Sequence, residues 1–422
     1  MEKDEDINME RYIDFNCNPV LGNGINMADV EGRTFGDALY MYGTSEDGIR
    51  IVSTKDMKSF TDYGIVLRGR DIDWAEAAGL WAPDCVSRNG KYYLYYSLPT
   101  GECGVSVSEK PEGPFENSRQ IKGITGIDPA VLIDDDGKAY IYYGQLDDVS
   151  VAELNEDMIS IDEASVKHPL NVADFEYHEG ISVRKAGGKY YLVYTDTSRH
   201  GGIPVCQGYA VSENPVEGYI YKGILVDNFG CDPSSWNNHG CIECFNGKWY
   251  MFYHSATNNN RNVRQLFIEE LDMNDKGEFS EAEMTSSGIA GVISAKEIIP
   301  SSVACLLRGN VRKTYDENNL HKMLLTGISE GDSAIYKYVE FNGENIFKFK
   351  VKSRIPGRAE IYIDGKYNGC AEFPEDADFE EYSAVIPEIK GKHTVEIRFF
   401  GKCGWLQVYK LEEVSFSEFS FA

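Results

Sequence analysis

A short phrase of alternating aromatic and aliphatic residues recurs five times in the first two thirds of the chain. The copies are Gly36–Gly43, Gly90–Ser97, Gly137–Gly144, Gly188–Thr195 and Gly247–His254. Their first glycines are 54, 47, 51 and 59 residues apart. Asn-Gly, Asp-Gly or Gly-Gly pairs open the later four copies, and such pairs followed by aromatic and branched residues are typical of β-hairpins.

Further strand-like runs flank each phrase, and helical periodicity is scarce. Cys85–Ser87 and Ala130–Ile133 precede their turns as partner strands, while Gly104–Ser108 and Gly208–Ser212 follow as third strands. Four-stranded units that repeat about every 40–50 residues are typical of β-propellers, in which neighbouring sheets cover one another's faces. The pattern therefore predicts a five-bladed β-propeller over residues 14–298.

The phrase is absent after about residue 301, where a different pattern begins. Alternating strands are expected at Ile346–Lys352, Ala359–Ile363 and Val395–Phe399, separated by turns such as Asp364-Gly365. About 120 residues of this kind are enough for an independent β-sandwich. The chain is thus predicted to be all-β, with a propeller followed by a jelly-roll sandwich at 301–422.

Composition and charge exclude some classes of partner. The 422 residues include 41 Lys and Arg against 68 Asp and Glu, a net charge of −27 that would repel a nucleic acid backbone. No apolar run reaches the ~18 residues needed to cross a bilayer. Residues 1–16 are charged and lack the apolar core of a signal peptide, so we expect a cytoplasmic protein, or a secreted one if a leader has been removed.

Ten cysteines are scattered along the chain. Only Cys241 and Cys244 form a C-x-x-C pair, and no second pair follows at zinc-binding spacing. The pattern favours reduced, buried thiols over metal or disulfide roles, which agrees with a cytoplasmic protein.

Polar residues occupy one matched position in each predicted blade, six to nine residues before the first glycine of the phrase. They are Asp29, Asp84, Asp128, Glu179 and His239. The innermost strands of a propeller start near the central axis at the same end, so these side chains are expected to converge on one cavity. Crowded carboxylates raise one another's pKa, and such crowding is typical of catalytic or cation-binding sites.

A cavity of carboxylates with aromatic walls suits hydrolysis of glycosidic bonds. One carboxylic acid protonates the leaving oxygen while another carboxylate activates water or attacks the sugar. Aromatic side chains offer flat apolar faces on which sugar rings pack. Trp81 and Trp74 are the candidates for this platform.

Five stretches carry a family resemblance. They are Asn18–Leu21 with Ala28-Asp29, Trp81–Asp84, Ile127–Ala130 with Ile133–Gly137, His178–Gly180, and Asn237–His239 before the last phrase. On these motifs residues 17–297 resemble glycoside hydrolase family 43, the five-bladed propellers that cut arabinose- and xylose-containing glycans.

The resemblance implies a role for each acid. Asp29 falls at the position of the general base, Glu179 at that of the general acid, and Asp128 at that of a third carboxylate that tunes the acid. Glu176 is a rival for the acid, but Glu179 has the same nine-residue spacing to its glycine as Asp128. The family inverts anomeric configuration, which requires about 6.5–9.5 Å between base and acid.

Three further residues have two interpretations each. His239 is either a satisfied core histidine or, by the resemblance, an axial residue that binds substrate and contacts a structural Ca²⁺; no cofactor is expected for catalysis. Arg264 is either a surface cation or the arginine that reaches the sugar or the acid in the family. His254 ends the last phrase and is predicted to be structural.

The second domain resembles a family 6 carbohydrate-binding module. The stretches that carry this are Ile335–Val339, Ala359–Gly365, Gly391–Phe400 and Gly404–Tyr409. Gln407 stands where those modules have a binding asparagine, and Phe379 where they have a tryptophan. The domain is therefore expected either to bind sugar weakly or to wall the pocket of the propeller.

The combined prediction is an exo-acting or debranching hydrolase. It would release arabinofuranosyl or xylosyl units from xylan- or arabinoxylan-derived oligosaccharides or polysaccharides, and a cytoplasmic enzyme would act on imported oligosaccharides. Two alternatives stay open: a galactan- or arabinan-cleaving member of the family, and a catalytically silent propeller that only binds glycans.

Overall fold

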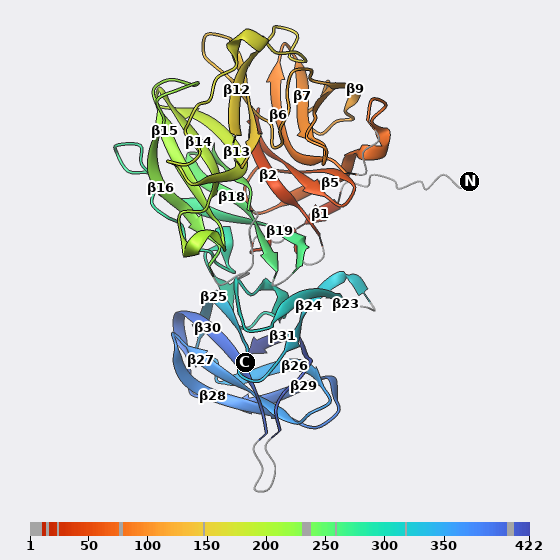
Figure 1. The fold of residues 1–422 in the computed structure, drawn as a ribbon. Helices are drawn as coiled ribbons and strands as arrows, with labels where there is room; N and C mark the ends of the chain where they lie inside the picture. Colours follow the sequence, from red (N-terminus) through yellow and green to blue (C-terminus); the bar gives the residue numbers. More distant parts are fainter. Residues whose placement is uncertain are drawn as a thin grey trace, which may run out of the picture.

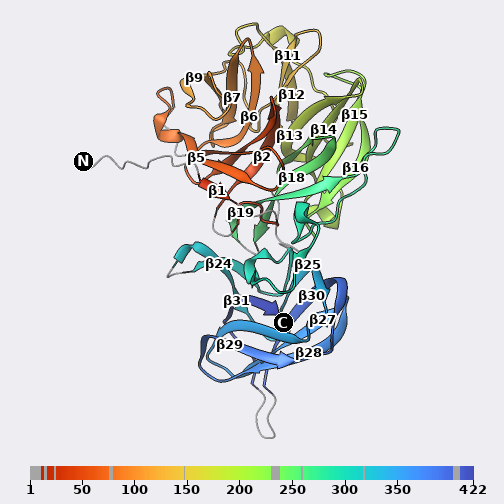
Figure 2. The ribbon, with the colours of Figure 1, turned by 180° about the vertical axis from the view of Figure 1, so that it is seen from behind.

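The chain forms two β-rich bodies, a propeller and a sandwich, joined end to end (Figure 1). The computed structural model describes residues 11–13, 17–22, 25–75, 79–146, 148–229, 238–257, 260–316, 319–402 and 409–422. The view from behind shows the same division, with β1 to β19 in the upper body and β24 to β31 in the lower one (Figure 2). The predicted all-β class is confirmed.

Five antiparallel sheets make up the propeller within the described residues. The first has the order β1 (Arg11–Ile13), β5 (Phe60–Arg68), β4 (Gly48–Thr54), β3 (Ala38–Ser45) and β2 (Ala28–Phe35). The second has β6 (Trp81–Arg88), β7 (Lys91–Ser97), β8 (Cys103–Ser108) and β9 (Glu116–Gln120). The third has β10 (Ala130–Ile133), β11 (Ala139–Gln145) and β12 (Asp148–Leu154). The fourth has β13 (Tyr177–Ala186), β14 (Lys189–Asp196), β15 (Cys206–Ser212) and β16 (Ile220–Asp227), and the fifth has β17 (Gly240–Phe245), β18 (Lys248–Thr257) and β19 (Asn260–Leu271).

Each repeated phrase forms the second strand of its sheet, after a tight turn from the innermost strand. Gly90 at one of these turns has φ = +75°, a conformation that glycine adopts without strain. One tyrosine of each phrase is fully or almost fully buried between strands and sheets: Tyr42, Tyr95, Tyr142, Tyr194 and Tyr253. The aromatic residues of the phrase therefore fill the space between blades.

The start of the chain closes the ring of blades. The Val20 amide donates to the Leu266 carbonyl at 3.0 Å, and the Met27 amide donates to the Arg264 carbonyl at 3.0 Å. Residues between β1 and β2 thus pair with β19 of the last blade, which ties the two ends of the propeller together.

The sandwich consists of two sheets around a phenylalanine-rich core. One sheet has the order β20 (Ile293–Ser294), β25 (Ser333–Asn342), β30 (Lys390–Gly401), β27 (Gly357–Ile363) and β28 (Lys366–Phe373), with β22 (Leu306–Arg308) also on β25. The other has β23 (Arg312–Asp316), β24 (Asn319–Ile328), β31 (Val414–Phe421), β26 (Ile346–Ser353) and β29 (Ala377–Val385), with β21 (Ile299–Pro300) on β31. Short 3₁₀ turns are η1 (Gly69–Asp71), η2 (Glu163–Ser165), η3 (His200–Gly202), η4 (Gly288–Ala290) and η5 (Ser301–Val303).

The two bodies contact each other through the segment that joins them. The Ser287 amide donates to the Lys337 carbonyl at 2.7 Å, and the Lys337 ammonium lies 2.7 Å from Glu283. The predicted domain boundary at residues 298–301 stays a prediction. Ile293–Ser294 pair with β25 of the sandwich, which favours a boundary before residue 293.

Several other expectations concern the sandwich and the cysteines. Phe379 lies in β29, half-buried, with the Lys352 ammonium 5.9 Å from its ring centre, whereas Gln407 lies outside the described residues.

The eight described cysteines are all free and six of them are buried. In the part of the chain that the structure describes, no helix is long and apolar enough to cross a membrane.

Candidate active site

A cavity of about 500 Å³ opens at the end of the propeller where the innermost strands begin. It brings together six of the eight residues predicted for it: Asp29, Trp81, Asp128, Glu179, His239 and Arg264. Asn26, Thr44, Glu46 and Gln145 also line it. Every blade thus contributes at least one wall residue, as the convergence of the innermost strands predicts.

Irregular backbone at the start of the innermost strands turns the carboxylates toward the axis. Asp29 and Asp128 have φ values of +52° and +57°, which are uncommon for residues other than glycine. The pairing of β2 with β3 shifts between Ala28 and Glu31, as it does in β13 on either side of Glu179. Such bulges bend a strand and redirect its side chains, and they are frequent beside active sites.

Gly180 follows the predicted acid in a position that only glycine fits. Its φ is +70°, and a Cβ atom there would lie 2.8 Å from Thr195 Oγ1 and 3.1 Å from His239 Cγ. The glycine after Glu179 therefore lets the acid and the axial histidine pack closely together.

Asp29 is buried but held in its charged form. Arg264 Nη1 lies 2.9 Å from Asp29 Oδ1, and the Asp29 amide donates to His254 Nδ1 at 3.2 Å. Burial alone would raise the pKa of Asp29, but Arg264, His254 and His239 outweigh burial and lower that pKa to about 2. Asp29 is therefore a carboxylate at any ordinary pH.

Glu179 and Asp128 have the opposite tendency. Burial and the nearby Asp29 charge raise the pKa of Glu179 to about 7, although Gln145 Nε2 donates to its Oε2 at 2.8 Å. Burial, Glu179 and Asp29 also raise the pKa of Asp128 well above its usual value, and the Gly180 amide donates to Asp128 Oδ2 at 2.9 Å. Among the described lining residues only Arg264 carries a guanidinium, so Asp29, Asp128 and Glu179 together keep a proton near neutral pH.

A ring of side chains from the second strands supports the innermost strands, each reaching the next blade around the axis. The pairs are Thr44 with the Ala82 amide, Ser97 with the Asp128 amide, Gln145 with the Glu179 carboxylate, Thr195 with the Asn238 carbonyl, and His254 with the Asp29 amide. Gln145 thereby touches the predicted acid, a role that the sequence analysis missed, and His254, which was predicted to be structural, holds the amide of the predicted base. The available signal was their shared place at the end of the repeated phrase.

Asp84 does not join the cavity, contrary to expectation. Arg33 donates to its two carboxylate oxygens at 2.8 and 2.6 Å, and the Val131 amide donates to Asp84 Oδ2 at 2.6 Å. Asp84 lies three residues into β6, whereas Trp81 begins that strand, so its side chain projects deeper into the channel. The acid in the second blade is therefore part of a buried ion-pair network below the cavity.

The two predicted tryptophan platforms lie in different surroundings. Trp81 lines the cavity and is 39% exposed, as an indole face available to a sugar must be. Trp74 Nε1 donates to Ser118 Oγ at 2.9 Å and its ring packs beside Gly104, away from the cavity lining. This placement does not support a sugar contact for Trp74. The rival acid Glu176 is likewise not among the lining residues.

His239 is the candidate contact for a structural cation. It is 4% exposed, neither ring nitrogen has a hydrogen-bond partner among the described residues, and Nδ1 lies 3.8 Å from Asp128 Oδ2. Burial lowers the pKa of His239, which keeps the imidazole neutral as a metal ligand must be. Ca²⁺ prefers oxygen ligands, so these residues fit an ion that His239 contacts at one point and that water molecules otherwise surround. The calcium ion stays a prediction.

A charged carboxylate and a protonated one in a single cavity of a five-bladed propeller suit a glycoside hydrolase. The chain belongs to glycosyl hydrolases family 43, whose family model matches residues 18–279.

The names of similar proteins also describe glycosidases. A xylosidase/arabinosidase of Thermoclostridium stercorarium is 26% identical over 91% of this chain and 96% of its own length. A β-xylosidase of Xylanibacter ruminicola is 32% identical over 49% of this chain and 75% of its own length.

Solved structures show the same fold. A family 43 arabinoxylan arabinofuranohydrolase from Bacillus subtilis matches 96% of this chain and 97% of its own, with a TM-score of 0.56 and 22% identity. A β-xylosidase/α-arabinofuranosidase from a compost metagenome, described in complex with xylotriose in a calcium-free form, matches 65% of this chain and 99% of its own, with a TM-score of 0.55 and 28% identity.

Proposed function

We propose that this protein is an inverting, exo-acting or debranching glycosidase. It releases arabinofuranosyl or xylosyl units from xylan- or arabinoxylan-derived oligosaccharides. The observation that carries the proposal is the split between two carboxylates of one cavity, with the pKa of Asp29 at about 2 and that of Glu179 at about 7. A charged base and a protonated acid then coexist at neutral pH, as hydrolysis requires.

Each side chain has a defined task in the proposed reaction. Asp29 accepts a proton from the attacking water molecule, and the oxygen of that water bonds to the anomeric carbon. Glu179 donates its proton to the glycosidic oxygen as the bond from that carbon to the leaving group breaks. Burial and the Asp29 charge keep Glu179 protonated, while Arg264 keeps Asp29 ionised. Asp128, whose own pKa is raised, is the third carboxylate beside the acid. The carboxylates and one water complete the reaction without a cofactor.

The choice of a pentose substrate is supported by the names of the relatives. Xylosidase/arabinosidase, β-xylosidase and arabinoxylan arabinofuranohydrolase recur among them, and one solved neighbour holds xylotriose. The exposed face of Trp81 suits the C–H face of such a ring, because stacking requires a flat apolar surface and no particular hydroxyl pattern.

One experiment tests both linkage and stereochemistry. The protein is incubated with a defined arabinoxylo-oligosaccharide and, separately, with p-nitrophenyl arabinofuranoside and xyloside, and the first-formed anomer is followed by NMR. Release of a pentose with inverted configuration is expected. Retained configuration would overturn the inverting assignment, and no turnover on a broad glycan panel would leave a glycan-binding propeller.

A further inference from the structure

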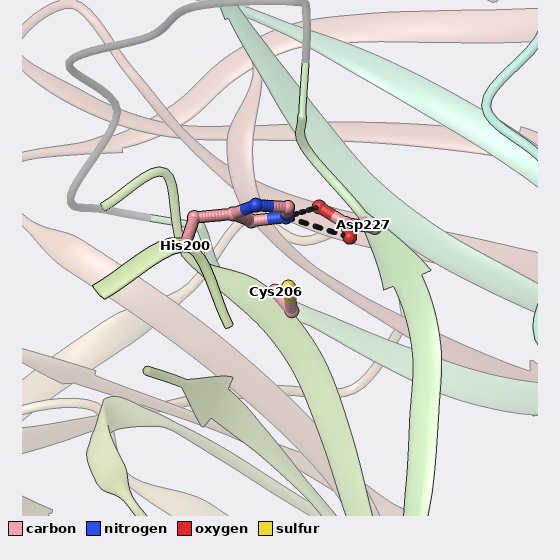
Figure 3. A group of neighbouring side chains, drawn as sticks. All are labelled: His200, Cys206 and Asp227. Carbon is pink, nitrogen blue, oxygen red and sulfur yellow. Dashed lines mark hydrogen bonds and ion pairs between the residues drawn. The ribbon is translucent and has the colours of Figure 1, made fainter. Parts of the chain in front are cut away.

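Three side chains with metal-binding atoms meet on the outer part of the fourth blade, at the cavity end of the propeller. His200, Cys206 and Asp227 each offer one ligand atom, and these atoms all lie within 4.8 Å of one another (Figure 3). The mechanism proposed above uses none of the three.

The backbone row that holds this group starts beside the catalytic acid. Tyr177 pairs with Asp196, Asp196 with Cys206, and Cys206 with Asp227, across β13, β14, β15 and β16. Three strand spacings put Asp227 about 14 Å from Tyr177 along this row. The group therefore shares the cavity face but is separate from the catalytic carboxylates.

Two of the three side chains are fixed by the sheet. Cys206 and Asp227 lie directly opposite each other on β15 and β16, so their separation is set by strand pairing. Cys206 is fully buried, and Asp227 is largely buried. In Figure 3 both side chains point into the same space as the His200 ring.

The third side chain comes from a glycine-rich turn between β14 and β15. His200 has φ = +56° and is followed by Gly201 and Gly202, which also have positive φ. Its imidazole stacks on Phe229 at 4.6 Å with 16° between the planes, and its Nε2 lies 2.9 and 3.1 Å from the Asp227 oxygens. An uncommon backbone conformation thus holds the imidazole over the carboxylate.

The donor set points to one kind of cation. Ca²⁺ and Mg²⁺ take oxygen ligands, whereas a thiolate, an imidazole nitrogen and a carboxylate oxygen together suit Zn²⁺. Three protein ligands leave a fourth tetrahedral position for water. A thiolate and a carboxylate also balance the two positive charges of the ion.

Some of the present partners of Asp227 can be exchanged for the ion. Asp227 accepts from the Phe229 amide at 2.8 Å and from Arg199 at 3.0 Å. Arg199 is itself held by two bonds to Glu281, at 2.7 and 2.8 Å, so it keeps an anchor when Asp227 turns to a metal. Burial and Asp227 raise the pKa of the Cys206 thiol, so the metal-free site keeps that proton.

We propose that His200, Cys206 and Asp227 bind Zn²⁺. Binding forms a zinc–sulfur bond and releases the thiol proton to solvent. The ion ties the turn between β14 and β15 to the end of β16 and so stiffens the rim of the fourth blade. This proposal does not depend on the sugar that the enzyme cleaves.

Co²⁺ and Zn²⁺ titrations of the full-length, metal-stripped protein without a polyhistidine tag test the site. Co²⁺ is expected to give a thiolate-to-cobalt charge-transfer band in the near ultraviolet, and Zn²⁺ to abolish this band at one equivalent per chain. Cys206→Ser removes the band, and His200→Ala, at a partly exposed position, weakens Zn²⁺ binding at least about tenfold.

Two matched variants control for unspecific effects. His168→Ala removes another histidine–aspartate pair, in which His168 Nδ1 lies 2.9 Å from Asp148, and no described cysteine forms a group of metal-binding atoms with this pair. Cys103→Ser removes another fully buried thiol. Both are expected to bind Zn²⁺ as the parent protein does. The proposal is overturned if the parent gives no charge-transfer band, or if His200→Ala and Cys206→Ser bind Zn²⁺ as tightly as the parent.

Discussion

The propeller channel has two charged regions: the cavity, which we call its upper part, and the ion-pair network below the cavity, its lower part. The two regions neutralise their carboxylates differently. In the lower part three carboxylates each reach a guanidinium: Asp84 bonds to Arg33 at 2.6 Å, and Glu31 and Glu243 bond to Arg184 at 2.7 and 2.6 Å. In the cavity above, Arg264 serves three carboxylates and lies against only one of them, Asp29.

The difference separates charge with a structural role from charge in the candidate active site. A buried ion pair with a full set of hydrogen bonds holds elements together, and removing one partner leaves a costly unpaired charge. Carboxylates left short of cations instead tend to keep protons: the pKa of Glu179 and that of Asp128 are raised by burial and by the neighbouring carboxylates. Burial also raises the pKa of Glu31, but there Arg184 opposes it. The two regions therefore differ in what mutation of a charged residue does: one loses stability, the other loses chemistry.

The largest expected effect is on catalysis in the cavity. Glu179→Gln should slow cleavage of natural oligosaccharides by about 10²–10⁴-fold, since it removes the general acid. The loss should be far smaller on aryl glycosides, whose leaving groups need little protonation, whereas Asp29→Asn should slow both substrate types alike. Steady-state kinetics on both substrates measure this, and equal losses for Glu179→Gln would remove the acid from its role.

The next effect is on stability in the lower channel. Arg184→Met leaves Glu31 and Glu243 without their guanidinium, and should lower the free energy of unfolding by about 3–5 kcal/mol. Arg184 is suited to this test because its side chain is only 7% exposed. The matched control is Lys55→Met, which breaks an exposed pair with Asp37 and should cost less than about 1 kcal/mol. Urea unfolding compares the two, and equal costs would contradict a structural network.

A smaller effect of opposite sign is expected in the cavity. Glu179 keeps its proton up to about pH 7 in the folded protein but loses it near its ordinary value of 4.5 when unfolded. The folded state then binds more protons than the unfolded state between these values, so wild-type stability falls as pH rises through that window. Glu179→Gln should therefore melt at a higher temperature than wild type at pH 8 and show little gain at pH 4. A lower melting temperature at pH 8 would show that the charge stabilises the fold.

The sequence alone predicted the blades and most of the cavity, because both follow from local patterns repeated in register. The phrase that begins at Gly137 and its four relatives place the second strands, and the nine-residue spacing places Asp128 and Glu179. Asp84 precedes the first glycine of its phrase by only six residues. This shorter spacing was the sign that its side chain lies deeper in the channel than the cavity.

Contacts between blades could not be predicted in the same way. Gln145 reaches the Glu179 carboxyl and His254 reaches the Asp29 amide, each in a neighbouring blade. A local sequence pattern cannot identify partners that lie 34 and 225 positions apart. The same limit hid the group on the fourth blade, since His200, Cys206 and Asp227 are joined by strand pairing and a turn rather than by a spaced motif.

The smallest expected effect concerns the tuning of the acid by the ring of second-strand side chains. The Gln145 amide donates to Glu179 at 2.8 Å and favours the charged carboxylate, so it lowers the pKa of Glu179. Gln145→Met should raise that pKa and move the basic limb of the kcat/KM profile upward by about one pH unit, the worth of one hydrogen bond to a charged group.

Thr44→Val is the matched control, because Thr44 lowers the pKa of Asp29 in the same way. It should move the acid limb upward from about pH 2 and leave the basic limb in place. The pH dependence of kcat/KM reports pKa values of the free enzyme. The acid limb can therefore be assigned to Asp29 and the basic limb to Glu179 without reference to bound sugar. A basic limb that moves equally in both variants, or that moves downward in Gln145→Met, would show that Glu179 is not the group that titrates there.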